Sequence, residues 1–114
     1  MSEFPAPADR PQVVFADNGA KHRFQAVIDG HTVAAYYQLE EGSIRFTHTI
    51  VPEELRGRGL ANDLVVHALA DVRGRGLKVT PQCPVFAAYM RRHAESQDLL
   101  TPEGRTMLGL DAEP

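Results

Sequence analysis

A glycine- and arginine-rich segment at residues 56–61, with the sequence RGRGLA, has the composition of an anion-binding loop. It follows a β-like run that ends at Val51 and precedes a helical pattern that continues to about Arg73. Glycines at the mouth of a helix let backbone N–H groups approach a phosphate closely, and the helix N-terminus adds about half a positive charge. The segment therefore predicts a phosphate site formed by backbone N–H groups.

Other glycine-rich motifs fit this segment poorly. A dinucleotide-binding fingerprint requires a third glycine, but this chain has Asn62 at that position. A Walker loop requires Gly-Lys-Ser or Gly-Lys-Thr, and the segment contains neither. Arginine–glycine strings also occur in disordered RNA-binding segments, but this one is not repeated and lies between ordered patterns. Taken alone, the segment could also be a plain tight turn between a strand and a helix.

Cys83 and His48 are side chains suited to covalent or proton-transfer chemistry. Pro84 is favoured at the first position of a helix, which places Cys83 near an N-cap, where a thiolate is favoured. Cys83 could accept an acyl group or protonate a leaving sulfur, or it could be a small buried hydrophobe. His48 could be a general base near neutral pH or a core histidine on an apolar strand face. Glu53 is the competing base.

The residues before the loop predict three antiparallel strands, over residues 24–28, 33–39 and 43–51. Asp29 and Gly30 separate the first two strands and form the pair that a type I′ hairpin prefers. By the two-residue period of a strand, one face of the third strand should carry Ile44, Phe46, His48 and Ile50.

The residues after the loop predict a helix over residues 60–73, because apolar residues recur at three- and four-residue spacings. A short strand at residues 77–80 follows, and the helical connection should make it parallel to the strand that ends at Val51. A second helix should run over residues 84–93. The predicted fold class is α+β with a mixed sheet: antiparallel strands, then a β-loop-α-β unit and a C-terminal helix.

The length of 114 residues allows one small domain. We expect a flexible tail at residues 1–11, a folded domain over 12–100 and a C-terminal tail over 101–114 with at most one more helical turn. The net charge of -3 offers no overall attraction to nucleic acid or anionic lipid. A single cysteine, no signal-like start and no apolar run of about 20 residues favour a cytoplasmic protein without a membrane partner. The histidines show no metal-ligand spacing.

Two separated motifs resemble the compact YjdJ-type domains of the GNAT superfamily of N-acetyltransferases. They are HTIVPEELRGRGLA at residues 48–61 and PQCPVFAAYMRRH at residues 81–93, and the resemblance spans roughly residues 22–100. It implies a minimal GNAT fold in which the pyrophosphate of acetyl-CoA binds the backbone amides of residues 58–61. Members commonly carry an acidic residue where this chain has Ile50, and PEY where it has AES after the second motif.

The resemblance also implies that two parallel strands splay apart and that the thioester of acetyl-CoA lies in the gap, near His48 and Cys83. Tyr89 holds a position from which GNAT enzymes contact the CoA sulfur, although it could equally be a core aromatic. The candidate catalytic residues are therefore His48, Cys83 and Tyr89. The candidate cofactor-binding residues are Thr49, Val51, Arg56, Gly57, Arg58, Gly59, Leu60 and Ala61.

The expected function is transfer of an acetyl group from acetyl-CoA to a primary amine by direct attack in a ternary complex, without a metal. Three alternatives stay open: ping-pong transfer through an acetyl-Cys83 intermediate, a non-catalytic acyl-CoA-binding module, and a protein-interaction domain. No residue pattern identifies the acceptor amine. A monomer and a homodimer are both compatible with the sequence.

Overall fold

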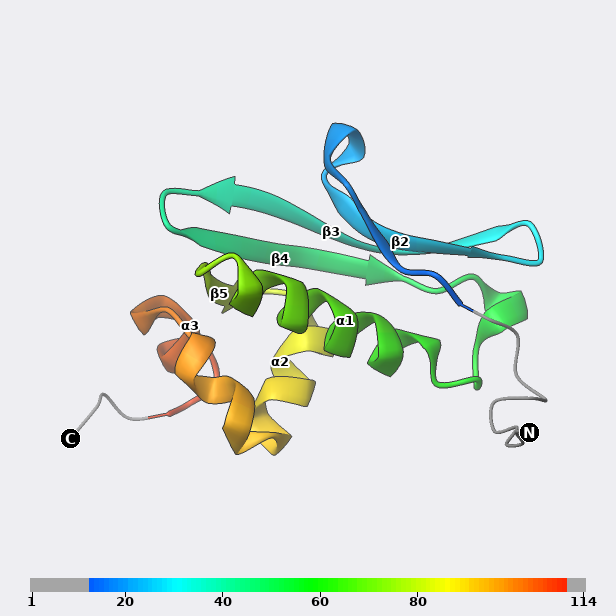
Figure 1. Cartoon of the computed structure of the whole chain (residues 1–114). Coiled ribbons are helices and arrows are strands. Elements are labelled where there is room, and N and C mark those ends of the chain that lie inside the picture. Colours follow the sequence, from blue (N-terminus) through cyan, green and yellow to red (C-terminus); the bar gives the residue numbers. More distant parts are fainter. Residues whose placement is uncertain (1–12, 111–114) are drawn as a thin grey trace, which may run out of the picture.

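The computed structural model describes residues 13–110, so the tail expected at residues 1–11 and the last residues 111–114 lie outside the described part (Figure 1). One sheet contains five strands in the order β1-β2-β3-β4-β5. The strands are β1 (Ala16–Asn18), β2 (Arg23–Ile28), β3 (His31–Glu40), β4 (Ser43–Ile50) and β5 (Lys78–Pro81). The helices are α1 (Leu60–Gly74), α2 (Pro84–Arg92) and α3 (Pro102–Met107), with 3-10 turns η1 (Gly19–Lys21), η2 (Glu53–Leu55) and η3 (Ala94–Leu99).

The helices α1 and α2 cover the same face of the sheet, as Figure 1 shows. Phe46 of β4 stacks on Phe86 of α2 with 3.9 Å between ring centroids. Phe24 of β2 lies on the same face and meets His67 of α1 edge-on. Within the described residues, the opposite face has no such helical cover, and we call it the open face. The predicted α+β class with a mixed sheet is confirmed.

The strands β4 and β5 are parallel, as the helical connection between them predicts. Their pairing runs from Ser43 opposite Lys78 to Phe46 opposite Pro81 and then stops. The N–H of Cys83 still donates to the carbonyl of Phe46 at 2.8 Å, after which the chain turns into α2. Within the described residues, β4 continues to Ile50 beside β3 alone. We call this edge of β4 over residues 47–50, where β5 no longer pairs with it, the gap.

A β-bulge at Thr47 divides β4 into two halves. Tyr36 of β3 pairs with His48 while Tyr37 pairs with Phe46, so Thr47 is the extra residue. A one-residue insertion reverses which side chains face the core. The prediction that His48 and Ile50 share a face with Phe46 is therefore wrong: both are exposed on the open face.

The turn between β2 and β3 has the predicted hairpin conformation. Asp29 and Gly30 both adopt positive φ, at 53° and 79°. Such values at both central residues are the requirement of a type I′ turn, which Asp-Gly satisfies well. This hairpin lies beside the glycine loop, because Asp29 pairs with Arg58.

The strand β1 has no counterpart in the sequence prediction. Tertiary contacts hold it: the Tyr37 hydroxyl donates to Asp17 at 2.5 Å, and Arg75 after α1 forms an ion pair with the same carboxylate. Burial, together with the Asp17 contact, raises the pKa of Tyr37 to about 12. These contacts hold β1 close to the C-terminal end of α1.

The residues after position 100 pack onto the domain. Leu100 forms a parallel bridge with Val79, and α3 packs against β5. Arg45 of β4 binds Glu103 of α3 through two hydrogen bonds of 3.0 and 2.8 Å, which lower the pKa of the Glu103 carboxyl. Leu108 is buried in the same core. A C-terminal helix of six residues thus stands where at most one helical turn is expected.

Candidate functional site

The glycine loop lies between η2 and α1, and within residues 13–110 no side chain caps the first N–H groups of that helix. Gly57 and Gly59 have positive φ, at 84° and 74°, so each occupies a conformation that other residues rarely adopt. Gly59 is the N-cap of α1, and no side chain caps that helix in the described chain. The first N–H groups of a helix have no carbonyl partner within it. A Cβ placed on either glycine would meet nothing within 4 Å, so a ligand can approach this backbone.

The arginine side chains of the loop are already engaged. The Nε of Arg56 donates to the carbonyl of Val51 at 3.1 Å, and Arg58 lies 3.5 Å from the carboxylate of Asp29. Both arginines are exposed. The Leu60 side chain is buried in the core, so this residue can offer a ligand only its N–H group. The backbone is therefore the pre-formed part of the candidate anion site.

We expect Asp29→Asn to tighten the binding of a pyrophosphate-bearing ligand at the loop about two- to threefold at low salt, because an exposed pair is worth under about 1 kcal/mol and its removal releases Arg58. Asparagine tolerates the left-handed conformation of this turn, so the hairpin should persist. Calorimetry measures the affinity. Asp98→Asn, which breaks the ion pair with Arg73, makes the same change in net charge elsewhere and should leave binding unchanged. Weaker binding by Asp29→Asn would mean that Asp29 aims Arg58 at the ligand.

Cys83 and Thr49 form a partly buried pair on the covered side of the gap. The Thr49 hydroxyl lies 3.1 Å from the Cys83 sulfur, and Cys83 is 1% exposed. The bulge at Thr47 accounts for this pair, because it brings Thr49 to the core face opposite Ala35. Cys83 is the N-cap of α2, as predicted, and its sulfur makes no capping hydrogen bond. A thiol with a hydroxyl neighbour at a helix N-terminus can give or accept a proton.

His48 lies on the open face, across β4 from Cys83. Its ring stacks on Tyr36 with 4.5 Å between centroids and an angle of 11° between planes. Its Nδ1 lies 3.1 Å from the Thr47 hydroxyl. β5 no longer pairs with β4 at this position, so His48 stands on the part of β4 that borders the gap. The two strongest sequence candidates therefore flank one stretch of strand from opposite faces.

Tyr89 and Glu53, the other two candidate side chains, lie outside the pair formed by Thr49 and Cys83. Tyr89 lies half-buried on α2, packs against the core and stacks on His93 with 3.8 Å between centroids. His93 Nδ1 in turn lies 2.8 Å from the Tyr89 carbonyl. Glu53 is exposed in η2, just beyond the end of β4. Of the candidate groups, the structure brings together Thr49 with Cys83 and the glycine loop with Val51.

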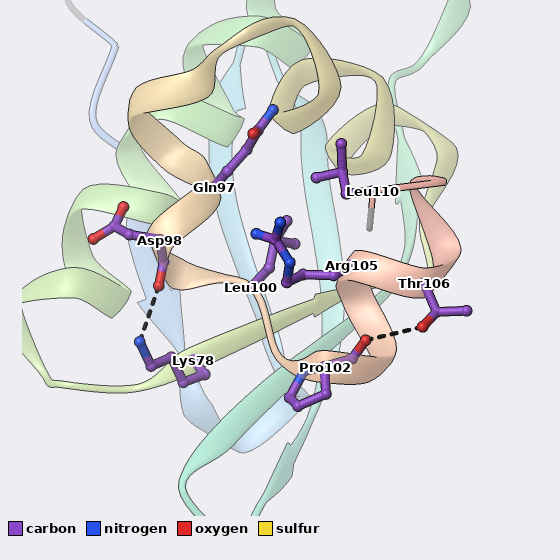
Figure 2. Close-up of a pocket in the computed structure, with 8 residues that line it drawn as sticks. All are labelled: Lys78, Gln97, Asp98, Leu100, Pro102, Arg105, Thr106 and Leu110. Carbon is purple, nitrogen blue, oxygen red and sulfur yellow. Dashed lines mark hydrogen bonds between the residues drawn. The ribbon is translucent and has the colours of Figure 1, made fainter. Parts of the chain in front are cut away.

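A separate pocket of 480 Å³ lies among β5, η3 and α3 (Figure 2). Lys78 at its wall donates to the carbonyl of Asp98 at 2.9 Å, and Figure 2 shows the Arg105 side chain directed into the hollow above Leu100. None of its lining residues belongs to the candidate site. Lys78 stands at the first position of β5, whereas Cys83 follows the last, so the two sites lie at opposite ends of that strand.

No helix within residues 13–110 has the length and apolar character that crossing a membrane requires. In the same part of the chain, no three His, Cys, Asp or Glu side chains are grouped as metal ligands.

A comparison with protein families identifies the family to which the glycine loop and the parallel pairing of β4 and β5 belong. A family model described as GCN5-related N-acetyl-transferase matches residues 23–99. The chain belongs to this family. No curated protein matches the chain. Membership supports acyl transfer as the general activity. The matched range begins with β2 and ends with η3, so it includes the sheet from β2 to β5, the loop and both long helices.

The sequence prediction assigns no role to the side chains of two residues beside His48, Thr47 and Tyr36. A threonine and a tyrosine within strands look like ordinary β-forming residues, because neither carries a motif. Their relation to His48 depends on the bulge, which arises from the pairing of β4 with β3. The only signal in the sequence is that both lie near the candidate histidine. Thr47 directly precedes His48, and Tyr36 belongs to the neighbouring predicted strand.

Proposed function

We propose that the chain is an acetyl-CoA-dependent N-acetyltransferase that transfers the acetyl group to a primary amine by direct attack in a ternary complex. One observation carries the proposal: a glycine loop with open backbone N–H groups stands at the end of β4, the strand from which β5 diverges. The loop suits a pyrophosphate, since anions bind well at helix N-termini. The gap beside β4 suits the extended arm that joins the pyrophosphate to the thioester.

The donor would then lie along β4. The amides of residues 58–61 bind the pyrophosphate, and residues 47–51 border the pantetheine arm. This placement carries the thioester toward the point where β4 and β5 separate, at Phe46 and Cys83. The covered side of that point holds the pair of Thr49 and Cys83, and the open side holds His48.

The acceptor amine approaches over the open face. Its nitrogen forms a bond to the thioester carbon, the carbon–sulfur bond breaks, and His48 takes the proton that the amine loses. The CoA thiolate takes a proton from the Cys83 thiol, and the buried sulfur recovers one through the hydroxyl of Thr49, which is partly exposed. His48 is exposed, so its proton also returns to solvent. The positions of the two groups on opposite faces support the direct route, because a ping-pong route would have the buried Cys83 hand its acetyl group across β4.

Burial of Cys83 also favours one alternative, a module that binds acyl-CoA without turnover. Release of CoA thiol in the presence of acetyl-CoA and an amine distinguishes the two functions. A module would bind CoA with the same loop but release no thiol above the solvent rate. Polyamines, amino acids and lysine-containing peptides cover the main classes of primary amine for this assay.

We expect Cys83→Ser to retain substantial activity, within about tenfold of the wild type, because serine keeps a donor beside Thr49. With the direct route, double-reciprocal plots at several amine concentrations should intersect. Cys83→Ala fills less space and offers no donor, so it should be the slower of the two variants. Parallel lines together with an inactive Cys83→Ser enzyme would instead establish an acetyl-Cys83 intermediate. The ping-pong route needs a thiolate as nucleophile, and the serine hydroxyl does not ionise readily enough to replace it.

A further inference from the structure

One ring nitrogen of His48, Nδ1, lies in a chain of polar contacts with Thr47 and Tyr36. Thr47 and His48 are consecutive, and in a regular strand their side chains would point to opposite faces. The bulge removes this alternation, and the Thr47 hydroxyl reaches His48 Nδ1 at 3.1 Å. The same hydroxyl lies 3.3 Å from the carbonyl of Tyr36. Thr47 thus connects the imidazole to the backbone of the neighbouring strand.

The direction of these two hydrogen bonds follows from the count of protons. A backbone carbonyl can only accept and Thr47 has a single hydroxyl proton, so both contacts are hydrogen bonds at the same time only if that proton goes to the Tyr36 carbonyl. In that arrangement the hydroxyl oxygen has only lone pairs to offer His48, and Nδ1 is the donor. In neutral imidazole one nitrogen carries the proton and the other does not. Nδ1–H therefore leaves Nε2 with a free lone pair.

We propose that Thr47 is a positioning residue that holds neutral His48 in the tautomer protonated at Nδ1, so that Nε2 is the nitrogen that takes the proton of the acceptor amine. The catalytic part of this inference rests on the proposed function, and the tautomer itself does not. A histidine with the opposite tautomer would present an N–H to the amine and could not accept its proton. The bulge thus both turns His48 to the open face and sets its protonation.

The stack of side chains on the open face keeps the ring in place for this hydrogen bond. Tyr36 lies between His48 and Arg23, whose guanidinium carbon is 5.7 Å from the Tyr36 ring centroid. Arg23 also donates to the Tyr36 hydroxyl at 2.9 Å and to Gln25 at 2.6 Å. The ring of His48 therefore has one side against a fixed aromatic neighbour and the other toward the gap. Arg23 is the charged group that faces it through this stack.

The tautomer can be measured without any substrate. In protein labelled with ¹⁵N-histidine, long-range proton–nitrogen correlations at about pH 8.5 distinguish protonated from unprotonated ring nitrogens when imidazole is neutral. The His48→Gln spectrum identifies the signals of His48 among the five histidines. We expect Nδ1 to be protonated and Nε2 unprotonated in the wild type. Thr47→Val should shift the ratio of the two tautomers roughly fivefold toward Nε2–H, the worth of one ordinary hydrogen bond.

Two matched variants complete the test. Thr47→Ser keeps the hydroxyl and should restore the wild-type tautomer, and Thr32→Val removes a threonine hydroxyl from β3 and should change nothing. A wild-type His48 protonated mainly at Nε2, or a Thr47→Val spectrum like that of the wild type, would overturn the inference. The acetyl-transfer rate should fall about fivefold in Thr47→Val and recover in Thr47→Ser. A shifted tautomer with an unchanged rate would overturn the role of His48 as base.

Discussion

Replacing Gly59 with valine should weaken CoA binding by roughly a hundredfold, the worth of about two charge-assisted hydrogen bonds. Gly59 has φ of 74° and open space around its Cβ direction. A branched side chain there would stand where the pyrophosphate has to approach and would also shift the first N–H groups of α1 out of position. Isothermal calorimetry with CoA measures the loss.

Gly76→Val is the matched control, because Gly76 has nearly the same φ, 73°, and equally open surroundings. It follows the other end of α1, a helix of 15 residues and so about 22 Å long. Both variants carry the strain of a left-handed conformation, roughly 1–2 kcal/mol, so their melting temperatures should fall together. Only Gly59→Val should lose CoA affinity. Equal affinities in the two folded variants would rule out the loop as the pyrophosphate site.

His48→Gln should lower the acetyl-transfer rate by about a hundredfold or more, the usual contribution of a positioned general base. In the wild type the rate should fall as the pH drops through the range where imidazole becomes protonated, because an imidazolium has no lone pair to accept a proton. Glutamine cannot titrate, so this acidic limb should disappear. CoA affinity should stay near normal, since His48 lies beside the gap and away from the glycine loop.

The control variant is His22→Asn, and its pH profile is compared with that of His48→Gln. His22 is exposed in a left-handed conformation that asparagine tolerates, and it stacks on Tyr37 away from the gap. Its replacement should leave both the rate and the acidic limb unchanged. If His48→Gln retains the wild-type limb, the base is another group, with Glu53 the first candidate.

The elements that the sequence predicts correctly are those with local signals. Asp29 and Gly30 mark the hairpin because type I′ geometry demands positive φ at both positions. Gly57 and Gly59 of the loop adopt the positive φ that glycine accommodates best. The parallel pairing of β4 and β5 follows from the helix between them. In each case a short stretch of chain contains the physical cause of the structure.

The elements that the sequence prediction misses depend on contacts between distant residues. A bulge has no composition of its own, so the two-residue period placed His48 on the core face when it belongs to the open face. β1 is only three residues long, and Asp17 holds it through Tyr37 and Arg75. The sequence therefore supplies the candidate residues, but the separation of His48 from Cys83 by β4 could not be predicted from it.

The most direct test of the account compares CoA with pantetheine, which lacks the pyrophosphate, in amide NMR titrations of the ¹⁵N-labelled protein. We predict that CoA shifts the amides of residues 57–61 most strongly, and that pantetheine shifts residues 47–51 while leaving the loop unchanged. The loop amides would then report the pyrophosphate alone. If CoA leaves the loop unchanged, or shifts mainly the pocket at Lys78 and Leu100, the glycine loop is not the donor site and the account is contradicted.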